Sequence, residues 1–193
     1  MVELALNLSP TADPIDLSEL AAAVRSSSNF RFTWRFFRLK AADLRAYSTV
    51  AASLDAIVRR SDLHSFLSDS MDDIYPRQFQ IEPLHKHASL EIDSGYFLDT
   101  MARASLDRLG AYSRDLSPST SDERAEIHRL FLSLGPYIAF HTKPGNDPNC
   151  EYCKIHNNDL ISNWFFDVAW DFTFLLTWPN ASVLWMGCLT DTD

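Results

Sequence analysis

The sequence predicts an α+β fold, in which several amphipathic helices pack on a small antiparallel sheet that includes a C-terminal β-hairpin. Residues 30–36 and 170–190 alternate in the two-residue period of strands, whereas residues 98–112 and 127–134 carry apolar side chains three and four positions apart. The chain has 193 residues, of which 46% are hydrophobic and 22% charged. This length and composition are typical of one globular domain, so we expect a single domain over residues 1–193.

The first elements are a helix and a strand. A helix is expected from about Leu17 to Arg25, with Asp16 as its N-cap. In the strand 30–36, four aromatic side chains occupy one face, and Arg31, Thr33 and Arg35 occupy the other. This alternation predicts a half-buried strand.

Helical spacing of apolar residues also predicts helices over residues 44–58 and 63–74. Residues 78–92 contain Pro83 and alternate only weakly, which is typical of a loop or a short edge strand. A further helix is expected over residues 98–112.

The next helix has clear end signals. Thr120 is followed three residues later by Glu123, a spacing that predicts a capping box at the N-terminus. The pair Gly135-Pro136 is expected to end the helical segment.

The C-terminal hairpin is expected to reverse around Pro179 to Ser182. Pairing Trp178 with Val183 fixes the register, which places Phe174 opposite Gly187 and Leu176 opposite Trp185. The small Gly187 then leaves space for an aromatic ring, and the aromatic face of the hairpin should lie in the core. The hairpin also explains why residues 172–190 contain no charge, although that stretch is about long enough to span a bilayer.

Charge restricts the partners. The formal net charge is -9, from 26 acidic and 17 basic side chains. We therefore expect neither nucleic-acid nor membrane binding, because both surfaces are anionic. A protein partner with a basic face would be attracted. The start, Met1 to Leu4, lacks a basic flank and a long apolar run, so a soluble, cytoplasmic protein is expected.

One segment has the residue types of a metal site. His141, Cys150, Cys153 and His156 supply two thiols and two imidazoles, the ligands that zinc prefers. The two cysteines are separated by two residues, and turn-forming residues 143–149 could fold His141 back toward them. Zinc is one interpretation; a loop without metal and a redox-active thiol pair are the others.

A second group of possible metal ligands is His85 and His87, which would lie on one side of a strand, with Glu91 on that side if the strand continued. If these residues met the segment 150–156 at one ion, the protein could be a metal-dependent hydrolase or nuclease. A solvated loop is the alternative.

Acidic residues gather at the open end of the hairpin. Asp171, Asp191 and Asp193, with Trp164 or Trp170 as an aromatic anchor, could form a contact surface for a basic partner. A solvated, negatively charged end is the alternative.

The favoured function is therefore binding of a protein partner, as in a small inhibitor, antitoxin or immunity protein. The chain contains no nucleotide-binding glycine motif, nucleophile elbow, zinc-protease helix motif or calcium loop. The alternatives are the metal-dependent hydrolase or nuclease and a zinc-stabilised interaction module.

Overall fold

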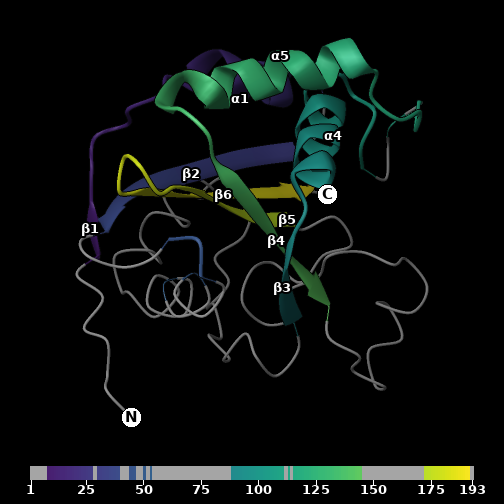
Figure 1. Cartoon of the computed structure of the whole chain (residues 1–193). Coiled ribbons are helices and arrows are strands. Elements are labelled where there is room, and N and C mark those ends of the chain that lie inside the picture. Colours follow the sequence, from purple (N-terminus) through teal and green to yellow (C-terminus); the bar gives the residue numbers. More distant parts are fainter. Residues whose placement is uncertain are drawn as a thin grey trace, which may run out of the picture.

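The computed structural model describes residues 8–27, 30–39, 44–46, 50, 53, 88–110, 113, 115–144 and 172–191. In this part of the chain, three helices lie on one side of a six-stranded antiparallel sheet (Figure 1), so the fold is α+β, as predicted. The strand order is β1-β2-β6-β5-β4-β3. The strands are β1 (Leu8–Pro10), β2 (Phe30–Leu39), β3 (Ala88–Ile92), β4 (Ile138–Pro144), β5 (Phe172–Trp178) and β6 (Val183–Asp191).

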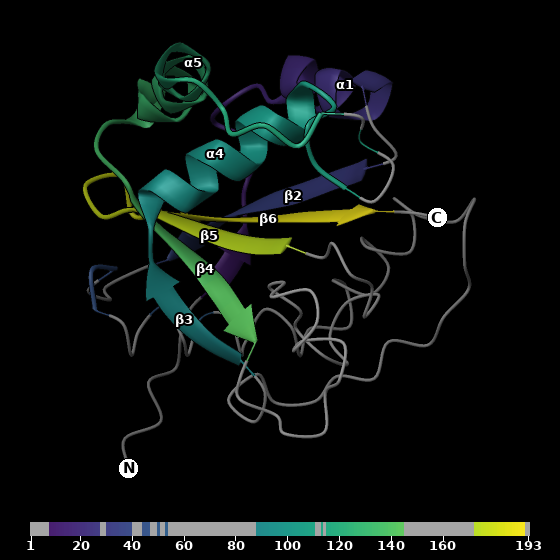
Figure 2. The same cartoon turned by 90° about the vertical axis from the view of Figure 1, so that its right-hand side faces the viewer.

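The helices are α1 (Ser18–Ser27), α4 (Ser94–Ser105) and α5 (Ser121–Phe131), and a 3-10 turn, η2 (Leu132–Leu134), continues α5. Figure 2 shows α4 crossing the sheet between α1 and α5. The core between the helices and the sheet is rich in aromatic side chains. Its largest fully buried members include Trp178, Trp185, Phe97, Phe131 and Phe174.

The predicted hairpin register is confirmed at every described pair. Trp178 pairs with Val183, Leu176 with Trp185, and Phe174 with Gly187. The ring that uses the space at Gly187 is that of Trp185, two residues earlier in β6, rather than the ring of Phe174 across the ladder. A Cβ added at Gly187 would lie 2.1 Å from Trp185 Cη2.

Strand β2 shows the predicted alternation, but it is more deeply buried than expected. Phe30 and Phe36 face the helices in the core. On the other face, Thr33 and Phe37 are also buried. The prediction of a half-buried strand over residues 30–36 is therefore wrong at Thr33, whereas Arg31 and Arg35 on the same face are partly exposed.

The helix ends follow local capping chemistry. The amide of Ser18 donates to Asp16 Oδ1 at 2.9 Å, so Asp16 caps the first turn of α1. The capping box of Thr120 and Glu123 is present at the start of α5. Gly135, with φ 97°, follows the end of η2, as expected.

Helix α4 differs from the predicted range 98–112. It begins earlier, because Asp93 accepts a hydrogen bond from the amide of Tyr96. It also ends earlier, at Ser105. Asp107 has a φ of 57°, in the left-handed region, and this conformation stops the helix.

Two strands lie where the sequence indicated loops or gave an ambiguous pattern. Residues 88–92, within the segment predicted as a loop or short edge strand, form β3, the last strand in the described sheet order. Strand β4 contains His141 and extends into the first two residues of the segment 143–149, which was expected to form a turn. Most of the predicted helices 44–58 and 63–74 lies outside the described residues. Among the helices that the structure describes, none combines the length and apolar character needed to cross a membrane.

A groove between three helices as the candidate functional site

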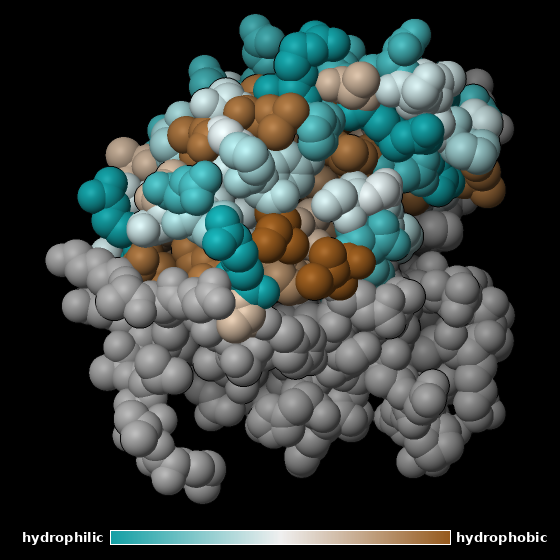
Figure 3. Space-filling model, viewed as in Figure 1, coloured by the Kyte–Doolittle hydropathy of each residue, from teal (hydrophilic) through white to brown (hydrophobic). Residues whose placement is uncertain are grey.

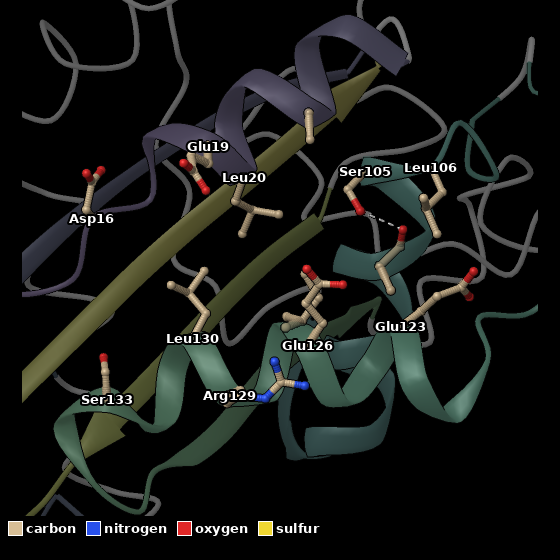
Figure 4. A pocket seen from close by; sticks show the side chains of 13 residues that line it. Asp16, Glu19, Leu20, Ser105, Leu106, Glu123, Glu126, Arg129, Leu130 and Ser133 are labelled. Atoms are coloured by element: carbon tan, nitrogen blue, oxygen red, sulfur yellow. Dashed lines mark hydrogen bonds between the residues drawn. The ribbon is translucent and has the colours of Figure 1, made fainter.

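The helical layer contains a groove with a volume of about 750 Å³, bounded by α1, α4 and α5 (Figure 4). It forms because α4 lies between the other two helices and packs against both. Ala102 and Ser105 supply small side chains from α4, and the Ser105 hydroxyl donates to the carbonyl of Ala102 at 2.8 Å. This volume lies within the usual range of ligand pockets.

The groove has an apolar lining. Leu20 of α1 and Leu130 of α5 point toward each other across it (Figure 4). Leu106, at the end of α4, is 42% exposed. Hydrophobic lining is contributed by all three helices, through Leu20, Ala23, Ala102, Leu106, Ile127 and Leu130. Figure 3 shows hydrophobic surface interrupted by hydrophilic side chains over the helical layer.

The rim of the groove is acidic. Asp16 and Glu19 lie on the α1 side, and Glu123 and Glu126 on the α5 side. The one basic residue in the lining is Arg129. Because Glu123 is paired with Arg108, three other carboxylates remain against the one guanidinium in the lining, and this excess of negative charge favours a cationic ligand.

Hydrogen bonds keep two of these carboxylates charged. The side-chain and backbone hydrogen bonds from Ser18 lower the pKa of Asp16. The backbone amide of Thr120 lowers the pKa of Glu123, and the nearby Arg108 acts in the same direction. Both groups therefore remain ionised below the pH at which an ordinary carboxylate becomes protonated.

The other two carboxylates are available to a ligand. Glu19 and Glu126 are exposed. Neither forms an ion pair with another residue in the part of the chain that the structure describes. They project from opposite walls of the groove, one from α1 and one from α5 (Figure 4). A cationic ligand in the groove would thus meet negative charge on both sides.

Polar contacts hold α4 and α5 together. Arg108 Nη1 lies 3.0 Å from both carboxylate oxygens of Glu123. Asp99 of α4 accepts hydrogen bonds from the amide and hydroxyl of Ser119, at 3.0 and 2.6 Å. These contacts join α4 and the segment after it to the start of α5, so two of the three walls of the groove are held together within the protein.

The predicted zinc ligands are placed only in part. His141 lies in β4, buried, with its ring centroid 4.6 Å from that of Tyr96 in α4. Cys150, Cys153 and His156 lie outside the described residues, so the zinc site stays a prediction. Within the described ranges, no group of three or more His, Cys, Asp or Glu residues could hold a metal ion.

Strands β3 and β4, which adjoin the segments that carry the other predicted ligands, pair with each other in the sheet. His85 and His87 lie outside the described residues, but β3 begins just after them, with Ala88 opposite Pro144 at the end of β4. Glu91 pairs with His141 in the same ladder. Cys150 follows Pro144 by six residues, which span at most about 21 Å.

Of the predicted partner-binding residues, only Asp191 lies in the described part, where it ends β6 opposite Phe30. Trp164, Trp170, Asp171 and Asp193 lie outside it. Sequence reasoning missed the groove, although one signal was present. In α5, Glu123 and Glu126 precede Ile127 and Leu130 at helical spacing, and this combination marks an acidic edge beside an apolar stripe.

No protein-family model, curated protein or solved structure matches this chain. A function for it must therefore be argued from the geometry and charge of the groove.

Proposed function

We propose that the protein works by binding a basic segment of another protein in the groove between α1, α4 and α5, in the manner of a small inhibitor, antitoxin or immunity protein. The supporting observation is the combination of an apolar lining with a rim of four carboxylates and one arginine. The formal net charge of -9 acts in the same direction over longer distances.

The two parts of the groove have different roles in this proposal. Burying apolar anchors of the partner in the lining supplies most of the affinity. The carboxylates increase the rate of encounter with a basic surface and disfavour acidic partners. The preformed link between Arg108 and Glu123 limits the entropy that is lost on binding.

Affinity capture with charge-reversed variants tests the proposal. The double variant Glu19→Lys, Glu126→Lys reverses charge on both walls, whereas the control Asp122→Lys reverses an exposed charge of α5 that does not line the groove. A partner present near stoichiometry should be lost with the double variant and retained by the control. A partner that both variants retain, or the absence of any partner, would contradict the proposal.

A second candidate, a site for a metal ion, is favoured by one observation. The pairing of Ala88 with Pro144 brings the segments after His87 and before Cys150 to the same end of the sheet. A structural zinc ion would be held by His141, Cys150, Cys153 and His156, whereas a catalytic ion would be held by His85 and His87 with ligands from the segment 150–156. The ion would support either hydrolysis or the stability of an interaction module.

A further inference from the structure

We infer that the partner enters the groove as a short amphipathic α-helix whose apolar stripe has lysine or arginine on both sides. The inference rests on the proposed function and specifies the conformation and chemistry of the bound segment. Three features carry it: the length of the groove, the helical nature of its walls, and the positions of its free carboxylates.

The length of the groove fits about three helical turns. Helix α5 and the turn after it line the groove from Glu123 to Ser133. Ten residue steps at the helical rise of about 1.5 Å cover about 15 Å. A helix lying along this wall would place side chains at positions i, i+4 and i+7 into the apolar lining.

The walls favour a helix over an extended peptide. The groove is lined by residues of helices, whose central amides and carbonyls are already bonded within each helix. An extended peptide would lose hydrogen bonds to water without receiving main-chain bonds from the walls. A helix satisfies its own backbone groups and presents only side chains to the lining.

The charges specify both edges of the bound helix. Glu19 projects from α1 and Glu126 from α5, on opposite sides of the apolar lining (Figure 4). A helix with basic residues on one edge only would leave one of these carboxylates without a counter-charge. Lysine or arginine flanking the stripe on both sides satisfies Glu19 and Glu126 together.

Three synthetic peptides test the inference. Each has 14 residues and the same numbers of leucine, lysine and alanine. In the first, the leucines follow helical spacing with lysines on both sides; in the second, leucine and lysine alternate as in a strand; in the third, the order is scrambled. Binding is measured by fluorescence anisotropy, and helix content by circular dichroism of the peptide alone, the protein alone and the mixture.

We expect the helical peptide to bind at least about tenfold more tightly than the other two and to gain helix on binding, because so short a helix is marginal in water. The groove variant Leu106→Ala should weaken its binding by about fivefold, because the peptide loses an apolar contact with the lining. The control Leu116→Ala, at a leucine that is 58% exposed and outside the groove, should leave binding unchanged.

Two further variants, each of which removes one negative charge from α5, complete the test. Glu126→Gln should weaken binding by about three- to fivefold, and Asp122→Asn, on the same helix outside the groove, should have little effect. The alternating peptide could instead bind as tightly as the helical peptide, lose affinity with both groove variants and gain no helix. That result would overturn the helical inference and leave the proposed function intact. If neither Leu106→Ala nor Glu126→Gln changes the affinity of the helical peptide, the inference is wrong. The proposed function is tested separately, by affinity capture with the charge-reversed variants.

Discussion

Gly187 leaves no room for a side chain, because the indole of Trp185 occupies that space in the core. The indole of Trp185 lies over Gly187 and contacts the rings of Phe97 and Phe131, with centroid distances of 5.9 and 5.3 Å. These neighbours prevent the indole from moving aside. Gly187 is therefore required by the volume of Trp185.

Gly187→Ala should destabilise the protein by about 1–3 kcal/mol, as for other overpacked cores. In a Trp185→Leu background the same change should cost less by at least about 1 kcal/mol, because the indole atoms that meet the new methyl group are absent. Urea unfolding of the four proteins of this cycle, followed by circular dichroism, measures the difference. Equal costs in the two backgrounds would contradict the arrangement. Trp185→Ala alone should cost about 3–5 kcal/mol.

Tyr137 provides a test at high pH. Burial raises its pKa from the ordinary 10.0 to about 12. The folded state therefore favours the neutral phenol, and this contribution to stability is present below pH 10 and lost as the pH rises through about 12. Absorbance titration at the tyrosinate band should show a late ionisation that is missing in Tyr137→Phe. Ionisation of Tyr137 near pH 10 would show that the ring is not buried as described.

At the level of the elements, the start of α5 is stabilised by the carboxylate of Glu123, which makes two contacts. Glu123 Oε2 accepts the amide of Thr120 and also lies 3.0 Å from Arg108 Nη1. The pKa of Glu123 is therefore lowered in the folded state. Its stabilising effect is present above the ordinary value of 4.5 and is lost as the pH falls through the folded pKa.

Glu123→Gln should therefore flatten the loss of stability below about pH 4.5, because glutamine has no charge to lose. Thermal unfolding between pH 7 and pH 3 measures this effect. Glu126→Gln is the matched control, since it removes a carboxylate from the same helix without removing a capping contact. If the melting temperature of both variants falls with pH as it does in the wild-type protein, ionisation of Glu123 does not contribute to the stability of the fold.

The sequence predicted elements best where one local rule determined the outcome. Alternation with a two-residue period allowed only one register for the hairpin around Pro179, and the spacing of Thr120 and Glu123 located the start of α5. The end of α4 was missed because it depends on the backbone of Asp107, which a helical pattern of side chains does not reveal. Strand β4 was missed because His141, a polar residue, lies buried inside it.

For the whole molecule, the groove could not be predicted from the sequence, because it exists only where three helices meet. Asp16 and Glu126 are separated by 110 positions, and no local pattern relates them. The three-dimensional packing of α4 between α1 and α5 brings their side chains to one rim. The predicted zinc ligands, by contrast, are close in sequence and await a direct test.

If zinc is bound as predicted, the purified protein should contain it stoichiometrically, and a chelator should lower the melting temperature without complete unfolding. Serine at Cys150 or Cys153 should abolish zinc retention. The control Cys188→Ser should retain it, because Cys188 is buried in β6, where its sulfur lies 3.7 Å from the Thr173 hydroxyl. Elemental analysis of protein prepared without a metal-binding tag measures the content. The zinc hypothesis would be contradicted if the purified protein contained no metal and its melting temperature changed neither with chelator nor with Cys150→Ser.

The burial of β5 bears on where the chain tolerates substitutions. All seven of its residues, from Phe172 to Trp178, are buried, so a substitution there changes packing on one face of the sheet or the other. Two residues of the rim, Glu19 and Glu126, are exposed and cap no helix, so either can change with little effect on folding. If the groove binds a partner as proposed, its specificity can therefore change through substitutions on the helices that leave the packing of β5 intact.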